Sequence, residues 1–564
     1  MAKKISSTWS ASLLRCTIQV ACMIIFLVLF FYVCWPYGSQ NYSEKMRSKE
    51  FIDAEIFLAL DPLLSISTTL AGKVWIWSLS FTLGIVLIGI IFPNSFCGYI
   101  CPFGTLIDLF DWAFNKRIVR TKIKRNGWWT NLKYYILSGV LLASIFGILL
   151  SGSFSSITVV TRGMLFLFSP LQMGLSKGWH LIPKMNAGHY ISLILFFAIL
   201  FLGLLRPRFW CCYVCPTGAV FSVSSLLRIN ERKVEKTCVS CGRCAEICPF
   251  DAIKTDYATK TTRCTFCKTC KKVCPTHSIK FVSRWNKENL KPKDEFPANE
   301  ISPSRRGFLF SIAGASVAIL GIKTVFGANL KSSANKAFVR PPGSVPEQKF
   351  LQMCIRCGEC IKACPNNVLQ PMSFEQGIEG IWVPKVVADW SGCEPTCNNC
   401  GQVCPTGAIR KLPIEEKRVA RMGLANVNKD ICLPFAGQRA CQFCVDECIS
   451  AGYNAIEFMQ VHTKTDDNGM PIEGTGYLAP VVLQDKCVGC GLCQTRCYNI
   501  NVKEKHLIPK SAIQIEAGYG KEDRIMKGSY IQLRDEELKK KQEGIKKQIE
   551  QKSSSDDYLP DFLK

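Results

Sequence analysis

The sequence predicts a multi-domain protein in which an α-helical membrane bundle is joined to small α+β domains built around cysteines. The chain of 564 residues is longer than one ordinary domain. Its mean hydropathy is positive, at +0.14, although 20% of its residues are charged, which indicates apolar spans combined with polar domains. Its 32 cysteines fall into repeated groups. The net charge is +25, but apolar runs separate the basic residues along the chain. This distribution does not indicate a nucleic-acid-binding protein.

Four apolar runs predict a transmembrane bundle of four spans within a membrane domain at 1–225. The runs cover 16–35, 74–92, 134–150 and 190–205, and a spanning helix needs about 20 such residues. Buried core helices are the alternative interpretation. Basic residues gather before the first run, between the second and third, and after the fourth. Because such residues favour the cytoplasmic side, we expect these three regions to be cytoplasmic.

Six groups of four cysteines repeat the spacing C-x2-C-x2-C-x3-C or a variant with one wider gap, and they account for 24 of the 32 cysteines. Thiolate is a soft ligand that suits the irons of a [4Fe–4S] cluster. Zinc motifs use cysteine pairs that lie far apart, and disulfide scaffolds belong to short secreted chains, so both alternatives fit less well. The groups are Cys238, Cys241, Cys244 and Cys248; Cys264, Cys267, Cys270 and Cys274; Cys354, Cys357, Cys360 and Cys364; Cys393, Cys397, Cys400 and Cys404; Cys432, Cys441, Cys444 and Cys448; and Cys487, Cys490, Cys493 and Cys497.

The first two groups predict how the ligands are shared. In two-cluster ferredoxins the fourth cysteine of a group binds the other cluster. We therefore expect Cys274 to complete the site of the first group and Cys248 to complete that of the second. This predicts a cytoplasmic α+β ferredoxin-like domain with two clusters at 226–285, and the other four groups predict a four-cluster domain at 331–520.

A targeting signal separates the two cysteine-rich regions. Arg305 and Arg306 belong to the twin-arginine pattern S-R-R-x-F-L, and an apolar stretch with the length of a signal sequence follows at 308–322. We expect the linker at 286–330 to hold this signal or anchor helix and to place the four-cluster domain in the periplasm. The alternative is a basic pair before an ordinary membrane helix, which would also place the four-cluster domain outside the cytoplasm. The charged tail at 521–564 predicts a solvated helix.

Two C-x3-C-P motifs repeat within the membrane domain, each after the second helix of a helix pair. A tandem repeat with parallel halves would bring both motifs to the cytoplasmic face. The thiols could ligate a metal or cluster, act as redox dithiols, or shape helix ends. The cysteines of these motifs are Cys97, Cys101, Cys211 and Cys215. The cysteines that we interpret as incidental are Cys16, Cys22, Cys34 and Cys212.

No motif for substrate conversion stands out. The sequence has no C-x-x-C-H haem motif, no G-x-G-x-x-G and no P-loop, and it has only five histidines. The chain is therefore expected to pass electrons, and the catalytic residues are unknown.

The combination of motifs resembles the NapH and NapG ferredoxin-type proteins. Residues 1–285 resemble NapH, with four spans, two C-x3-C-P motifs and two [4Fe–4S] motifs, and residues 300–520 resemble NapG, with a twin-arginine signal and four cysteine motifs. The sequence looks like a NapH–NapG fusion, and the related MauN and MauM proteins share the motifs.

The resemblance implies a quinol dehydrogenase component of the bacterial inner membrane. Such a protein would oxidise quinol and pass electrons through six [4Fe–4S] clusters to a periplasmic reductase of the nitrate reductase type, through c-type cytochromes. The alternative is a redox accessory or maturation factor for a periplasmic metalloenzyme, similar to MauM and MauN. His180 and His189 are candidate proton acceptors for quinol, although a loop histidine is more often simply solvated.

The predicted topology leaves a gap in the electron route. The cytoplasmic and periplasmic cysteine groups would be separated by about 30 Å of hydrocarbon. Quinone or the C-x3-C-P thiols must then bridge the gap, or the two cysteine-rich domains serve different steps.

Overall fold

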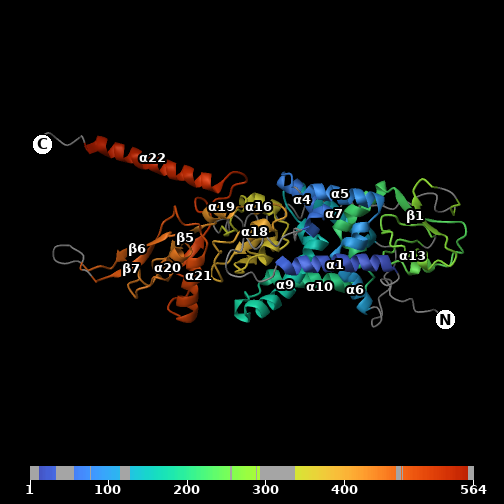
Figure 1. Ribbon diagram of the computed structural model, residues 1–564, viewed down its shortest axis with the longest axis horizontal. Coiled ribbons are helices and arrows are strands. Elements are labelled where there is room, and N and C mark those ends of the chain that lie inside the picture. The colour runs from blue at the N-terminus through green and yellow to red at the C-terminus, as the bar shows by residue number, and fades with distance from the viewer. Residues whose placement is uncertain are drawn as a thin grey trace.

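The structure is a computed structural model that describes residues 12–33, 56–76, 78–114, 128–254, 257–286, 289–291, 337–464, 472 and 474–556. Figure 1 shows an elongated molecule with three parts in a row. A helical bundle lies in the middle, a small cysteine-rich module lies at the end near the N-terminus, and a larger one lies at the opposite end. We call these the inner module (230–291) and the outer module (337–529). The predicted twin-arginine residues Arg305 and Arg306, the stretch 308–322 and Cys34 lie outside the described residues.

The bundle is built from helices that pack along one another, with α9 against α10, α4 and α11 against α7, and α1 against α6. Its helices are α1 (Leu13–Val33), α3 (Ile56–Ala59), α4 (Pro62–Gly72), α5 (Ser78–Ile91), α6 (Pro102–Phe114), α7 (Leu132–Ile145), α8 (Ser151–Phe154), α9 (Ser156–Lys177), α10 (Ala187–Phe201) and α11 (Pro216–Ser224). Shorter turns are η1 (Phe96–Ile100), η2 (Trp128–Asn131), η3 (Trp179–Leu181), η4 (Leu202–Leu204), η5 (Trp210–Val214) and η6 (Ser225–Leu227).

All four apolar runs contain helices, but within the described residues two helical segments are long and apolar enough to cross a membrane. These segments are Leu13–Tyr32 and Ala187–Leu204. The second and third runs form the shorter helices α5 and α7, of 14 residues each. The four-span bundle therefore stays a prediction.

The regions expected to be loops outside the bundle also hold helices. The segment after the first run contains α4, most of which is buried, and the segment between the third and fourth runs contains the 22-residue helix α9. The sequence did not predict α9 because Arg162 and Pro170 interrupt its apolar pattern. The structure shows that Arg162 is completely buried.

Three charged residues meet inside the bundle. Asp108 of α6 accepts two hydrogen bonds of 2.6 Å from Arg208 and also pairs with Arg15 of α1. Arg15 and Arg208 were both expected among the basic residues of cytoplasmic loops, yet both are fully buried. Both guanidinium groups lie over the ring of Phe250 in the inner module, at 5.1 and 4.6 Å from its centre. This ion cluster therefore ties α1, α6 and the inner module together.

Antiparallel backbone pairing closes each cysteine-rich unit. In the inner module β1 (Asn230–Val234) pairs with β2 (Ile279–Ser283). In the outer module the first unit is closed by hydrogen bonds from Val345 to Ala408 and from Arg410 to Gly343. The second unit is closed by β5 (Leu424–Val427) pairing with β8 (Ile513–Glu516). Each pairing brackets two groups of cysteines, so the chain repeats one design three times.

The remaining elements are short, apart from the last helix. They are α12 (Arg243–Glu246), α13 (Thr269–Lys272), α16 (Glu347–Met353), α17 (Glu359–Lys362), β3 (Leu369–Pro371), η9 (Ile378–Gly380), β4 (Pro384–Val386), α18 (Asn399–Gln402), α19 (Ile414–Val419), α20 (Phe443–Ser450), β6 (Ile456–Val461), β7 (Tyr477–Val482), α21 (Leu492–Cys497), η10 (Tyr498–Glu504) and α22 (Tyr530–Asp556). The strand β3 pairs with β4 and β6 pairs with β7. The helix α22 projects from the outer module (Figure 1), in agreement with the solvated helix predicted for the tail.

We expect Asp108→Asn to lower the free energy of unfolding by about 3–5 kcal/mol, because it leaves two buried guanidinium groups without their carboxylate. Denaturant unfolding of the purified chain in detergent would measure the change. The matched control is Asp485→Asn, which removes an exposed pair with Lys541 and should cost less than about 1 kcal/mol. Equal stability of the two variants would contradict a central role for the cluster.

Candidate metal centres

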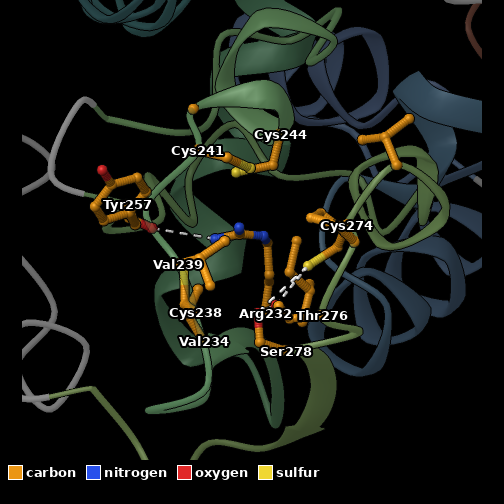
Figure 2. A pocket seen from close by; sticks show the side chains of 14 residues that line it. Arg232, Val234, Cys238, Val239, Cys241, Cys244, Tyr257, Cys274, Thr276 and Ser278 are labelled. Carbon is orange, nitrogen blue, oxygen red and sulfur yellow. Dashed lines mark hydrogen bonds between the residues drawn. The ribbon is translucent and has the colours of Figure 1, made fainter.

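Four cysteines surround a cavity in the inner module. Cys238, Cys241 and Cys244 come from one loop, and Cys274 comes from the other side, which is the grouping expected from their spacing. Figure 2 shows these side chains around the cavity, with Arg232 of β1 reaching between them. The Sγ atom of Cys274 contacts the Ser278 hydroxyl at 3.3 Å, so a polar partner orients it.

A second cavity of about 330 Å³ lies beside the first and is lined by Cys264, Cys267, Cys270 and Cys248. Arg232 lines both cavities. It donates to the carbonyl of Tyr257 and to the hydroxyl of Thr259, and its charge interacts with Cys270 and Cys244, one thiol from each cavity. Burial opposes this charge, but the thiols outweigh burial and raise the pKa of Arg232.

The outer module repeats the arrangement, with the fourth cysteine of each group facing the partner group. Two cavities, of about 380 and 330 Å³, are lined by Cys432, Cys441, Cys444 and Cys497, and by Cys448, Cys487, Cys490 and Cys493. Electrostatic interactions join the two remaining sets, which are Cys354, Cys357, Cys360 and Cys404, and Cys364, Cys393, Cys397 and Cys400. The structure therefore gathers all 24 motif cysteines into six sets of four.

A left-handed residue after the second cysteine shapes several of these loops. Gly242 and Gly358 have φ values of 76° and 87°, which glycine adopts without steric cost. Lys268 stands at the same place in the second group and takes φ 55° despite its side chain. A one-turn helix begins directly afterwards in each case. The turn brings the third cysteine back toward the first two, so the loop wraps around its cavity.

The cavities fit a cluster better than a single ion or a disulfide. Every cysteine among the described residues is free. No group of three or more His, Cys, Asp or Glu side chains in the described parts of the chain could hold one metal ion, whereas four thiols around a shared cavity suit a multi-iron group, whose irons each take one thiolate. Backbone N–H groups also point at the sulfurs, from Ala252 to Cys248 at 3.4 Å and from Ala455 to Cys448 at 3.2 Å.

Burial and nearby cations complete the chemistry. Burial raises the pKa of both Cys248 and Cys490 to about 12, so these thiols would keep their protons at neutral pH unless a metal replaced them. The buried ammonium group of Lys417 interacts with Cys393 and Cys397, and although burial opposes its charge, the thiols raise its pKa. No ion pair with a carboxylate joins Arg232 or Lys417 among the described residues, and buried cations of this kind suit an anionic cofactor.

The bundle holds a further group of thiols, which we call the four-thiol site. All four are buried or half-buried and belong to, or pack against, the core of the bundle. Cys215 interacts electrostatically with Cys97, Cys101 and Cys211. The members of the four-thiol site are Cys97, Cys101, Cys211 and Cys215. Cys212 points elsewhere, with its Sγ 3.7 Å from the carbonyl oxygen of Phe250.

Other candidates from the sequence have ordinary structural surroundings. Cys16 and Cys22 are half-buried on α1. His189 lies at the start of α10, where its side chain and Asn186 form a reciprocal capping arrangement, and His180 is exposed in η3. The buried cations Arg232 and Lys417 were not predicted from the sequence. Each is a basic residue close in sequence to a cysteine motif, and that proximity could have indicated them.

Comparisons with protein families assign iron–sulfur chemistry to three regions. A family described as "4Fe-4S binding domain" matches residues 74–125 and 189–233, and another with the same description matches 232–254. A family described as "4Fe-4S dicluster domain" matches 353–408. Matches to 4Fe–4S binding domains therefore lie in the bundle, in the inner module and in the outer module. No solved structure matches the chain.

Three of the curated proteins that the chain resembles are each similar to about a third of it. The "Ferredoxin-type protein NapG" of Escherichia coli (strain K12) is 32% identical over 197 residues, which cover 34% of this chain and 80% of that protein. The "Methylamine utilization ferredoxin-type protein MauM" of Methylorubrum extorquens is 35% identical over 202 residues, covering 35% and 85%. The "Putative electron transport protein YccM" of Escherichia coli (strain K12) is 29% identical over 167 residues, covering 29% and 43%. The chain belongs to the family of ferredoxin-type iron–sulfur electron-transfer proteins that includes NapG and MauM.

Proposed function

We propose that the chain is a membrane-bound component that takes electrons from quinol and delivers them through six [4Fe–4S] clusters to a periplasmic reductase or c-type cytochrome. The observation that carries this proposal is the division of the thiol sets, with two at one end of an apolar bundle and four at the other (Figure 1). A fusion of NapH-like and NapG-like parts would have this organisation, with the inner module cytoplasmic and the outer module periplasmic.

The surface of the bundle supports a membrane location. Large apolar side chains on three helices are exposed, among them Leu13 of α1 at 70%, Leu83 of α5 at 62% and Ile194 of α10 at 68%. Water would disfavour so much apolar surface, whereas lipid chains would cover it. Asp108 and Arg162, which lie within bundle helices, are instead buried, which is the arrangement expected inside a bilayer.

The residues of each set would hold one cluster by four thiolates. A bound [4Fe–4S] cluster accepts and releases one electron at a time, so the two electrons of a quinol would leave singly while its two protons go to the medium. Arg232 and Lys417 would offset the negative charge of the thiolates. Arg232 interacts with one thiol of each cavity of the inner module. This position would favour electron transfer between the two clusters of that module.

A redox accessory or maturation factor for a periplasmic metalloenzyme is the second candidate. The similarity to MauM, whose name refers to methylamine utilization, favours it. Both functions use the same thiol sets, so only a direct assay of quinol oxidation separates them.

Iron and acid-labile sulfide, measured on the anaerobically purified chain, should each reach at least about 24 atoms per chain, which is the content of six [4Fe–4S] clusters. The double variant Cys241→Ala/Cys244→Ala should lose about four of each, and the control Cys16→Ala/Cys22→Ala should lose none. Values near 16 in the parent chain would remove two sets from the proposal.

Reporter enzymes fused after Ser283 and after Lys564 should report opposite sides of the membrane. We expect cytoplasmic activity from the fusion after Ser283 and periplasmic activity from the fusion after Lys564. The same side for both fusions would contradict the proposed topology.

The purified chain in liposomes should oxidise quinol and reduce an added one-electron acceptor, with two acceptors reduced per quinol. The control is the same chain after iron removal, which should show neither reaction. Loaded protein that oxidises no quinol would favour the accessory role.

A further inference from the structure

The four-thiol site is formed by two halves with matching geometry. In each half a π-helical turn, η1 or η5, precedes a helix that begins at the proline of the motif. Cys101 and Cys215 occupy the junctions with nearly identical backbone angles, φ −60° with ψ 116° and φ −60° with ψ 115°. Asn94 and Arg208, two residues before each turn, both have φ 52°. The repeat read from the sequence is therefore also a structural repeat.

Capping alone does not explain the four cysteines. The Sγ atom of Cys215 accepts a hydrogen bond from the Gly218 N–H at 3.4 Å, so Cys215 acts as the N-cap residue of α11. Cys97 and Cys211, in contrast, lie inside the π-helical turns, where they cap no helix. Such turns occur frequently at functional sites. A redox dithiol must be accessible to the partner that oxidises or reduces it. Cys101 and Cys215 are only 8% and 4% exposed, so this role fits them less well.

The surroundings favour an anionic group. The N-termini of α6 and α11 both begin at the site, and the positive ends of helix dipoles stabilise negative charge. The Lys133 ammonium and the Arg208 guanidinium interact electrostatically with Cys97. Asp61, buried at the start of α4, opposes negative charge at Cys215, but its carboxylate accepts hydrogen bonds from Ser155 and Thr217. The Lys133 Nζ atom donates to Ser222 at 2.6 Å, so the structure holds this cation in place.

The site touches the inner module directly. Asn94 donates to the carbonyl of Cys264 at 3.3 Å, and the Tyr99 hydroxyl donates to the carbonyl of Phe266 at 3.0 Å. Gly98, next to Cys97, packs so closely on Thr265 that an added Cβ would lie 2.9 Å from the Thr265 Cβ. The second inner cavity, which Cys264 lines, is therefore adjacent to the four-thiol site.

On the other side, α9 connects the site to the outer module. Ser156, at the start of α9, lies 3.1 Å from the Cys215 sulfur. Six residues later Arg162 donates to the Arg356 carbonyl at 2.6 Å, between Cys354 and Cys357 of the outer module. Six helical residues correspond to about 9 Å. The four-thiol site thus lies between the thiol sets of the two modules.

We infer that the four-thiol site ligates one additional iron–sulfur cluster, which links the inner and outer clusters through the bundle. The four thiols supply the four ligands that a cluster of this kind takes, and the described residues around them offer no set suited to a single ion. The inference extends the proposed function, because it supplies the relay that the two separated modules require.

The test replaces the two junction cysteines by serine in the full chain. The variant Cys101→Ser/Cys215→Ser keeps residues that cap helices well but removes two thiolate ligands. We expect it to lose about two to four iron atoms and an equal amount of sulfide, together with one component of the Mössbauer spectrum. The control Cys16→Ser/Cys22→Ser should match the parent chain. Unchanged iron, or loss of another metal without sulfide, would overturn this inference while leaving the six proposed clusters intact.

A measurement on the parent chain covers the case in which the double variant does not fold. After anaerobic denaturation without reductant, alkylation and mass spectrometry should find all four cysteines of the site alkylated, as free thiols are, and none in a disulfide. Native protein should be alkylated there only after iron chelation. A disulfide within either motif would overturn the inference, and a parent chain without iron would overturn it together with the proposed function.

Discussion

The structure depends on the neutralisation of buried sulfur. A thiolate inside a protein is costly unless a cation or metal lies beside it, and here motif cysteines lie within or against the hydrophobic cores of the modules. The core of the last unit contains Cys432, Cys444, Cys448 and three further motif cysteines next to a few aliphatic side chains such as Val445 and Ile513. Because these thiols belong to the cores and also line the cavities, we expect cofactor binding and folding of the modules to be coupled.

This constraint explains why the same unit occurs three times. A loop of two or three residues between cysteines has little hydrophobic surface of its own, so each unit is closed by an antiparallel pair outside the cysteine groups, as β1 with β2 or β5 with β8. The exchange of the fourth cysteine between groups locks the two halves of a unit together. The inner unit is also fixed to the bundle, since Phe250 lies under Arg15 and Arg208.

The sequence predicted the parts that depend on local spacing. The six cysteine groups, the exchange of Cys248 and Cys274, and the repeat of the C-x3-C-P motifs all follow from residues close together in the chain, whereas the pairing of the four groups between 354 and 497 was left open. The helices α4 and α9 were missed, because a window of hydropathy treats Asp61 and Arg162 as signs of a loop. Their burial depends on partners far away in sequence, Thr217 for Asp61 and Arg356 for Arg162. The same reason hid the Arg15–Asp108–Arg208 cluster, whose members belong to three separate segments.

Both modules also pack directly against the bundle that lies between them. A bilayer presents about 30 Å of hydrocarbon, but the modules do not begin where the bundle ends. Ile355, Cys357 and Trp382 of the outer module belong to the same core as Phe103 and Phe221 of the bundle, and Gly152 lies against the carbonyl of Ile355 so closely that no side chain would fit between them. At the opposite end, Thr265 fills the space beside Gly98. The two modules therefore extend into the bundle from both ends, and the thiols of the C-x3-C-P motifs occupy the short interval that remains between them.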